Sequence, residues 1–420
     1  MSSTKETSRQ AMPFNLMDRD VQQCPYQAYS WLLQNAPVYR DPNTGMVMVT
    51  GYDLLREIVR DPATYSSDLD WISLRPGGVP EKSEALIREK GFKQYPSLSR
   101  MDDPIHKSKR SLVDAVFAGS RIKKMTPDID SIANDLIDAF IDRGECEFMR
   151  EFAFPLPCIV IAGQIGVPRE DIHLFKEWSD ASMSRISNML SDEEDYKAAE
   201  LLVDAQHYLK AIVDKRRAAP EDDIISGLIL TPLPEGRHLD DAEILSMLSE
   251  ILVGGNETTT SAIGAGMKVM LDRPDLVEEL RADPALMKNF VEEVLRLETP
   301  IQGLYRVTTK DVVLGGVPLP KGTPINMRWA AGNRDEAMFP NPADIDLKRR
   351  NAGAHVTFGS GIHHCLGATL ARVEMASSFS AVLRRMTDFR YPAGFEGVTY
   401  LPSLLQRTII ALPMTFRKAG

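Results

Sequence analysis

Apolar residues at helical spacing recur along most of this chain, and this pattern constrains its fold more than any other feature. The segments that carry the pattern are 131–143, 170–190, 196–217, 240–271, 274–282, 287–297 and 368–385. The longest predicts one helix of about 45–50 Å at a rise of 1.5 Å per residue. Asp240 followed by Glu243 predicts a capping box at the start of that helix.

Strand signals are short and few. They cover residues 46–50, residues 311–322 with the run to 327, and residues 407–412. Two long segments, 66–100 and 329–355, are predicted to be irregular, and long loops in a compact chain are often functional. The predicted fold class is mainly α with small β-sheets. We expect one domain over residues 1–420, with residues 1–12 disordered.

Charge and cysteine usage exclude several classes of protein. The chain has 49 Lys+Arg against 59 Asp+Glu, a net charge of −10, which argues against a general nucleic-acid binder. The four cysteines are scattered without a C-x-x-C pair, as in a reducing compartment. The N-terminus has no signal-peptide pattern, and the longest apolar stretch, 152–167, is too short to span a bilayer. We therefore expect a cytoplasmic protein without a membrane anchor.

The most informative segment is Phe358-Gly-Ser-Gly-Ile-His-His-Cys-Leu-Gly367. Cys365 follows a glycine-rich loop and precedes a predicted helix, whose amides and positive end favour a thiolate. The glycines allow the backbone to approach a flat object closely. Taken alone, Cys365 could be a buried small hydrophobe, a zinc ligand with His363 and His364, or a Cys/His nucleophile. The length of the pattern favours a chemical role.

With this motif and those that follow, the chain resembles the cytochrome P450 family of the soluble bacterial kind over nearly its whole length. The resemblance implies a triangular helical domain plus a minor β-rich region, and haem b as the cofactor. It implies that Cys365 is the axial thiolate ligand of the haem iron, which favours O–O cleavage. Phe358 would then pack against the haem beside the sulfur, Gly367 would allow close approach, and His363 would meet a propionate.

A second motif interrupts the longest predicted helix. Gly254 and Gly255 each cost about 1 kcal/mol relative to Ala in a helix interior, and the Thr258 hydroxyl can bond the Gly254 carbonyl and bend the helix. A packing notch for a crossing helix explains the glycines equally well. The resemblance implies instead an oxygen-binding groove at Gly255, in which Glu257 and Thr258 help to deliver protons to bound dioxygen.

Three further charged residues match the family's structural anchor. Glu293 and Arg296 are spaced as a helical i,i+3 pair, which is ordinarily a surface pair. The resemblance implies that this pair is buried and that Arg349 completes it. The family usually has Phe where Ile345 stands, which weakens the local match slightly. We interpret these three residues as structural.

Basic residues supply the remaining cofactor contacts. The resemblance implies that His106, Arg110 and Arg306 grip the haem propionates, although a solvated helix face is the plainer explanation for the first two. Neighbouring cations suggest a docking face for an acidic electron-transfer partner, and a solvated charge run explains them nearly as well. These cations are Lys107, Lys109, Arg121, Lys123 and Lys124.

The resemblance implies a monooxygenase that inserts one oxygen atom of O2 into a hydrophobic terpenoid, steroid, fatty acid or aromatic compound. Electrons would come from a separate ferredoxin and an NAD(P)H-dependent ferredoxin reductase. A peroxide-driven peroxygenase and a haem-binding sensor without turnover remain alternatives. The candidate substrate contacts, for each of which a core role is as plausible, are Trp71, Val253, Ile301, Leu304 and Leu404.

Overall fold

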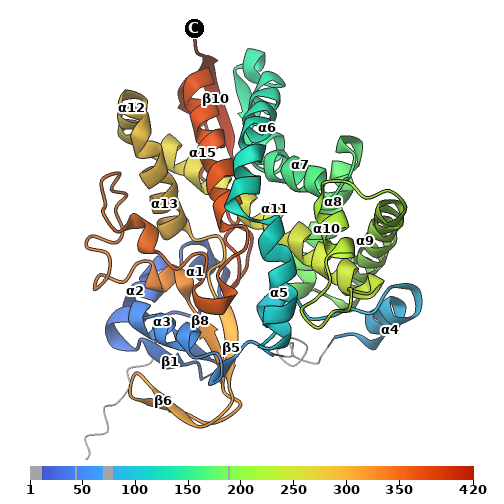
Figure 1. The fold of residues 1–420 in the computed structure, drawn as a ribbon. Helices are drawn as coiled ribbons and strands as arrows, with labels where there is room; N and C mark the ends of the chain where they lie inside the picture. Colours follow the sequence, from blue (N-terminus) through green and yellow to red (C-terminus); the bar gives the residue numbers. More distant parts are fainter. Residues whose placement is uncertain (1–11, 43–44, 70–78, 188–189) are drawn as a thin grey trace, which may run out of the picture.

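Helices dominate the computed structural model, which describes residues 12–42, 45–69, 79–187 and 190–420 (Figure 1). The helices of the first half are α1 (Arg19–Gln23), α2 (Tyr26–Asn35), α3 (Tyr52–Arg60), α4 (Glu81–Lys90), α5 (Ile105–Val116), α6 (Gly119–Asp138), α7 (Pro155–Gln164) and α8 (Ile172–Ser187). Those of the second half are α9 (Asp192–Ala218), α10 (Ile224–Leu230), α11 (Asp241–Asp272), α12 (Pro274–Ala282), α13 (Met287–Glu298), α14 (Trp329–Gly332) and α15 (Ala368–Arg385).

The strands form small sheets at the edges of the helical body. The strands are β1 (Val38–Arg40), β2 (Val47–Val49), β3 (Tyr65–Ser66), β4 (Glu145–Glu147), β5 (Leu304–Thr308), β6 (Val312–Leu314), β7 (Val317–Leu319), β8 (Pro324–Met327), β9 (Met386–Arg390) and β10 (Pro413–Lys418). One sheet has the order β1-β2-β8-β5-β3, in which β2 and β8 run parallel. A second has the order β4-β10-β9, and β6 pairs with β7. The first sheet lies with α1, α2 and α3 at the lower left of Figure 1, which agrees with the predicted minor β-rich region.

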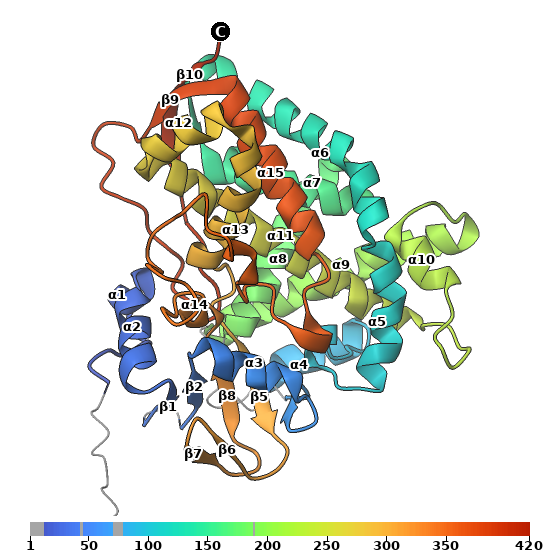
Figure 2. The ribbon, with the colours of Figure 1, turned by 60° about the vertical axis from the view of Figure 1, so that its left-hand side comes forward.

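The long helix α11 runs through the middle of the helical body (Figures 1 and 2). Its second half shares a hydrophobic cluster with α6, α7, α13 and α15, while its first half shares another with α8, α9 and α10. The ring of Phe379 on α15 packs against the α11 backbone at Gly266, where an added Cβ would lie 2.2 Å from its Cζ. This central helix therefore connects the two largest parts of the core.

The capping box predicted at the start of α11 is present. The Asp240 carboxylate accepts the Glu243 backbone N–H at 2.7 Å, and the Glu243 carboxylate accepts the Asp240 N–H at 3.1 Å. The two bonds satisfy amides that the first helical turn leaves unpaired. The prediction that this helix spans 240–271 is confirmed to within one residue at each end.

Two sequence predictions are wrong. Residues 407–412 do not form a strand, and only Ile409 makes an isolated bridge, to Tyr400. Their apolar side chains, Ile409 and Leu412, are instead buried in the core cluster, and the strand follows at β10. The prediction of irregular structure at 66–100 and 329–355 does not hold throughout, because these segments contain α4 and α14. The expected disorder of residues 1–12 lies outside the described residues, except at Met12.

None of the helices in the described ranges is long and apolar enough to cross a membrane.

Candidate active site

The loop that carries Cys365 is fixed by its own backbone. The Cys365 N–H donates to the Phe358 carbonyl at 2.9 Å, and the Gly359 N–H donates to the Val356 carbonyl at 2.9 Å. Gly361 has a φ of +68°, and an added Cβ would lie 2.7 Å from the carbonyl oxygen of Val59. Glycine is therefore required at this position by both conformation and space.

Cys365 lies just before the start of α15. It is deep in the protein, yet its side chain is accessible. Burial raises the pKa of the Cys365 thiol, while the amides of Gly367 and Ala368 and the cations Arg110 and Arg372 act in the opposite direction. The amides at the helix start thus act in the direction that the sequence predicted, although burial has the larger effect.

The arrangement does not support the alternative of a zinc site. His363 turns toward α5, where its ring lies 4.2 Å from that of His106, and its Nε2 lies 2.9 Å from the Ser67 hydroxyl. Among the described residues, no group of three or more His, Cys, Asp or Glu side chains could hold a metal ion. The neighbouring histidines therefore do not form a zinc-binding group with the Cys365 thiol.

A cluster of basic side chains lies beside this loop. His106, His363 and Arg306 come together from α5, the Cys365 loop and β5, and Asp102 acts electrostatically on all three. Arg306 is buried and donates to the backbone carbonyl of Tyr305, while Nε2 of His106 is buried without a hydrogen-bond partner. The sequence predicted these three residues as a group, and the structure brings them together.

The charge of this cluster at neutral pH comes from arginine. Burial lowers the pKa of Arg306 to about 10, so the guanidinium stays protonated. Burial, followed by the charges of Arg306 and His106, lowers the pKa of His363 to about 3, so its imidazole is neutral. Arg110 donates to the carbonyls of Ile362 and His364, at 3.4 and 2.8 Å, and so also holds the Cys365 loop.

In the middle of α11, which is a continuous helix, the predicted side-chain bond is present. The Thr258 hydroxyl donates to the Gly254 carbonyl at 2.7 Å, as the sequence predicted. Gly254 is exposed although α11 runs through the middle of the protein, and an added Cβ would meet nothing within 4 Å. An added Cβ at Gly255 would lie 3.5 Å from Ile161. The surface of α11 is therefore exposed at Gly254 and packed against Ile161 of α7 at Gly255.

Glu257 and Thr258 lie on different faces of α11. Glu257 is buried against α8, where its carboxylate lies 3.8 Å from the ammonium group of Lys176. Burial raises the pKa of Glu257, and Lys176 lowers it by a smaller amount. Lys176 is partly exposed, so it connects this buried carboxyl group to the solvent.

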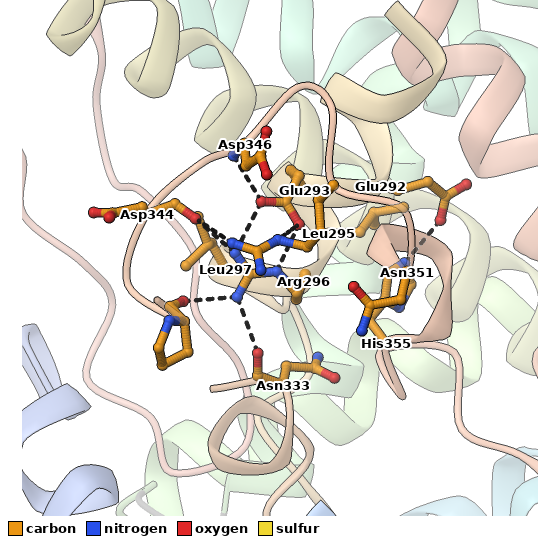
Figure 3. A network of polar contacts seen from close by, with 12 residues as sticks. Glu292, Glu293, Leu295, Arg296, Leu297, Asn333, Asp344, Asp346, Asn351 and His355 are labelled. Carbon is orange, nitrogen blue, oxygen red and sulfur yellow. Dashed lines mark hydrogen bonds and ion pairs between the residues drawn. The ribbon is translucent and has the colours of Figure 1, made fainter. Parts of the chain in front are cut away.

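The structural anchor predicted from Glu293, Arg296 and Arg349 is present and buried (Figure 3). Arg296 makes two bonds to the Glu293 carboxylate, at 2.7 and 2.9 Å, and Arg349 lies 3.1 Å from the same group. Arg296 also donates to backbone carbonyls of the 333–344 segment. The substitution of Ile345 for Phe does not disturb this arrangement, because Ile345 packs against the core.

The predicted substrate contacts do not gather in one hydrophobic cluster. Val253 packs with the first half of α11, Leu304 with the five-stranded sheet, and Leu404 with α2 and α14. Ile301 forms a β-bridge with Gln406. Trp71 lies outside the described residues. Their role as substrate contacts stays a prediction.

Sequence reasoning missed several polar groups that the fold places in contact with distant segments. Asp102 accepts hydrogen bonds from the Ser66 hydroxyl and from the Ser67 N–H at 2.9 Å, which fixes the Ser67 hydroxyl beside His363. Glu374 on α15 is fully buried near Thr259, and burial raises its pKa to about 8. No local spacing signals these residues, because each acts with a partner that is distant in the sequence.

The residues present fit the haem that the resemblance implies. The accessible Cys365 thiol is a soft ligand suited to iron, and the open surface at Gly254 leaves room for a flat group. The buried cation Arg306 can bind carboxylates, and so can the unpartnered Nε2 of His106 when its imidazole is protonated.

Known proteins have a similar architecture and a related sequence. Residues 173–390 match the family model "Cytochrome P450". The chain is 33% identical to a steroid C26-monooxygenase of Mycobacterium tuberculosis over 93% of each chain. It is 32% identical to a vitamin D(3) 25-hydroxylase of Pseudonocardia autotrophica over 94% of each. The structure of cytochrome P450 CYP109Q5 from Chondromyces apiculatus superimposes with a TM-score of 0.85 at 30% identity, covering 97% of this chain and 98% of that chain. With its accessible thiol and its buried cations in place, this chain belongs to the cytochrome P450 family, whose members bind haem b.

Proposed function

We propose that this protein is a haem-thiolate monooxygenase in which Cys365 is the iron ligand. The observation that supports the proposal most directly is the accessible Cys365 thiol, deep in the protein at the start of α15. The haem, when bound, supplies the activation of dioxygen. The protein then has to hold the cofactor, deliver protons and orient a hydrophobic substrate.

Side chains of three elements hold the cofactor in this proposal. Arg306 and His106 bind the propionates, with His363 as a neutral hydrogen-bond partner. Arg110 and Phe358 fix the loop on the thiolate side. Gly367 contributes backbone that can approach the ring closely, whereas the Cβ position of Gly255 faces Ile161.

Protons reach the oxygen side of the site through α11. Lys176 is partly exposed and lies beside the buried Glu257, and burial raises the pKa of that carboxyl group. The Thr258 hydroxyl is held by the Gly254 carbonyl beside the open surface of the helix. Glu257 and Thr258 therefore have the chemistry of a proton relay.

The substrate is a hydrophobic small molecule, and relatives with names such as steroid C26-monooxygenase and vitamin D(3) 25-hydroxylase favour the steroid class. The predicted contacts with it are Trp71, Val253, Ile301, Leu304 and Leu404. A spectral screen of steroids against fatty acids and small aromatics, read as a shift from low-spin to high-spin haem, tests this class.

Electrons come from a separate ferredoxin and its NAD(P)H-dependent reductase. Lys107, Lys123 and Lys124 are exposed and can attract an acidic partner. Lys109 does not belong to this surface, because it is buried in an ion pair with Glu243 at 3.1 Å. Turnover with ferredoxin supports the proposal, whereas turnover with hydrogen peroxide alone identifies a peroxygenase and no turnover identifies a sensor.

The ligand assignment is tested by the absorption of the reduced carbon monoxide complex. Cys365→Ala should abolish the thiolate-ligated band, and Cys365→His should move the band to the position of an imidazole-ligated haem. Cys24→Ala, which removes an exposed free cysteine, should leave the band unchanged. Retention of the thiolate band in both Cys365 variants would refute the assignment.

A further inference from the structure

The glutamate beside the structural anchor has a separate set of partners (Figure 3). The Glu292 carboxylate accepts two hydrogen bonds from Arg372, at 2.6 and 3.0 Å, and one from Nε2 of His355 at 2.9 Å. Burial alone would raise the pKa of Glu292. The hydrogen bonds from His355 and Arg372 outweigh burial and lower this pKa to about 2. Adjacent residues of α13 thus bind different parts of the chain, because Glu293 faces Arg296 and Arg349.

His355 connects Glu292 to the backbone that leads into the Cys365 loop. Its Nδ1 accepts the Thr357 N–H at 3.3 Å, so the proton is on Nε2, which donates to Glu292. Burial lowers the pKa of His355, which keeps the imidazole neutral at neutral pH. Glu292 is therefore tied through one neutral side chain to the residue that precedes Phe358.

Arg372 connects Glu292 to the ring of Phe358. The guanidinium carbon lies 4.5 Å from the centroid of that ring, within the range of a cation–π contact. The Phe358 carbonyl accepts the Cys365 N–H at 2.9 Å. The carboxylate thus holds Phe358 from its backbone side through His355 and from its ring face through Arg372.

We propose that Glu292 and Arg372 are positioning residues that set the reduction potential of the Cys365-ligated haem. Arg372 is the charge that contacts Phe358, and Glu292 both holds it there and offsets it. The inference rests on the proposed function, since it assumes that Cys365 is the ligand.

The electrostatics give opposite signs for the two partners. A positive charge near the iron stabilises its reduced state, which carries one positive charge less, and a negative charge destabilises it. Removing Glu292 leaves Arg372 without its counter-ion, so the midpoint potential rises. Removing Arg372 leaves the buried Glu292 without its cation, so the potential falls.

The test is a spectroelectrochemical titration of the haem-loaded, full-length protein and its variants. Glu292→Gln should shift the midpoint potential to a more positive value, and Arg372→Met should shift it to a more negative value. Arg372→Lys keeps the charge and loses the bidentate contact, so its potential should stay near that of the parent. Each variant is first checked for the thiolate-ligated carbon monoxide band, whose absence from the parent would disprove the proposed function itself.

Arg385→Met is the matched control, because Arg385 lies on the same helix and pairs with Asp138 at the far end. Its potential should equal that of the parent. Potentials of Glu292→Gln and Arg372→Met that match this control, or that move in the same direction, would overturn the inference. If Arg372→Met fails to load haem, Glu292→Gln decides alone, since only a positive shift agrees with the inference.

Discussion

At the scale of the residue, Thr258 combines a local structural bond with an accessible position. Its hydroxyl donates to the Gly254 carbonyl, so the hydroxyl oxygen keeps acceptor capacity toward the open surface of α11. Its neighbour Glu257 is buried on another face beside Lys176. The sequence predicted this local bond because donor and acceptor are four residues apart. It could not predict Lys176, which comes from another helix.

Replacing Thr258 tests the proton relay. Thr258→Ala should reduce the product formed per NADH by about tenfold or more, since positioned proton donors commonly contribute factors of ~100 or more. The lost reducing equivalents should appear as hydrogen peroxide. Thr258→Ser keeps the hydroxyl and should retain most of the coupling. Full coupling in the alanine variant would remove Thr258 from the relay.

Glu374 predicts a pH dependence of stability. Its pKa is raised from 4.5 to about 8 by burial, so the folded protein binds one proton more than the unfolded chain between these values. The free energy of unfolding therefore contains a contribution that is full below pH 4.5 and is lost as the pH rises through 8. At about 1.4 kcal/mol per pKa unit, the loss amounts to several kcal/mol.

The Glu374→Gln variant, which cannot ionise, should lose this part of the pH dependence. Thermal melts from pH 5 to pH 9 of the haem-loaded protein measure the effect, and the stability of the variant relative to the parent should increase with pH. Glu177→Gln, at an exposed position on α8, is the control. Parallel pH profiles for Glu374→Gln and the parent would contradict a buried neutral carboxyl group.

At the scale of the element, two glycines of α11 occupy different physical environments. Gly254 faces open space, whereas Gly266 allows Phe379 of α15 to approach. From the sequence, Gly254 could be either a helix defect or a contact point for a crossing helix. Only the packing of the neighbouring helices distinguishes these two explanations. The same limit explains the wrong strand at 407–412, where alternating apolar residues are buried without pairing in a sheet.

Alanine at these two glycines should therefore have opposite effects. Gly254→Ala should stabilise the haem-free protein by about 1 kcal/mol, which is the helix-propensity difference. Gly266→Ala should destabilise it by about 1–3 kcal/mol, because the methyl group would overlap the Phe379 ring. Unfolding midpoints of the two variants measure the difference, and a stabilising Gly266→Ala would show that the ring can move aside.

At the scale of the whole molecule, buried charge joins segments that are distant in the sequence. Glu293 binds Arg296 on its own helix and Arg349 from the 333–355 segment, and this buried anchor was predictable from the family resemblance. The basic cluster of α5 was predictable only in part. In the sequence, nothing distinguishes Lys109 from the exposed lysines near it. Only the fold shows that Lys109 is buried and paired with Glu243.

Removing the anion of the anchor should destabilise the entire fold. Glu293→Gln would leave two buried arginines without a counter-ion, and breaking such a pair commonly costs about 3–5 kcal/mol. We expect a lower melting temperature and earlier loss of haem absorption on heating. Glu279→Gln, at an exposed position on α12, should melt like the parent, and an unchanged melt for Glu293→Gln would show that the charge is dispensable.

The capping box of α11 also has a consequence for local motion. Glu243 binds Lys109 of α5 and Arg237 besides closing the first turn of α11, and its hydrogen bonds, that from Arg237 foremost, lower its pKa to about 2. Fraying of that turn would break these ion pairs together, and helix ends ordinarily open first. Deuterium should therefore enter the backbone amides at this end of α11 slowly, as it does at a helix centre, so the first segment to exchange will lie elsewhere.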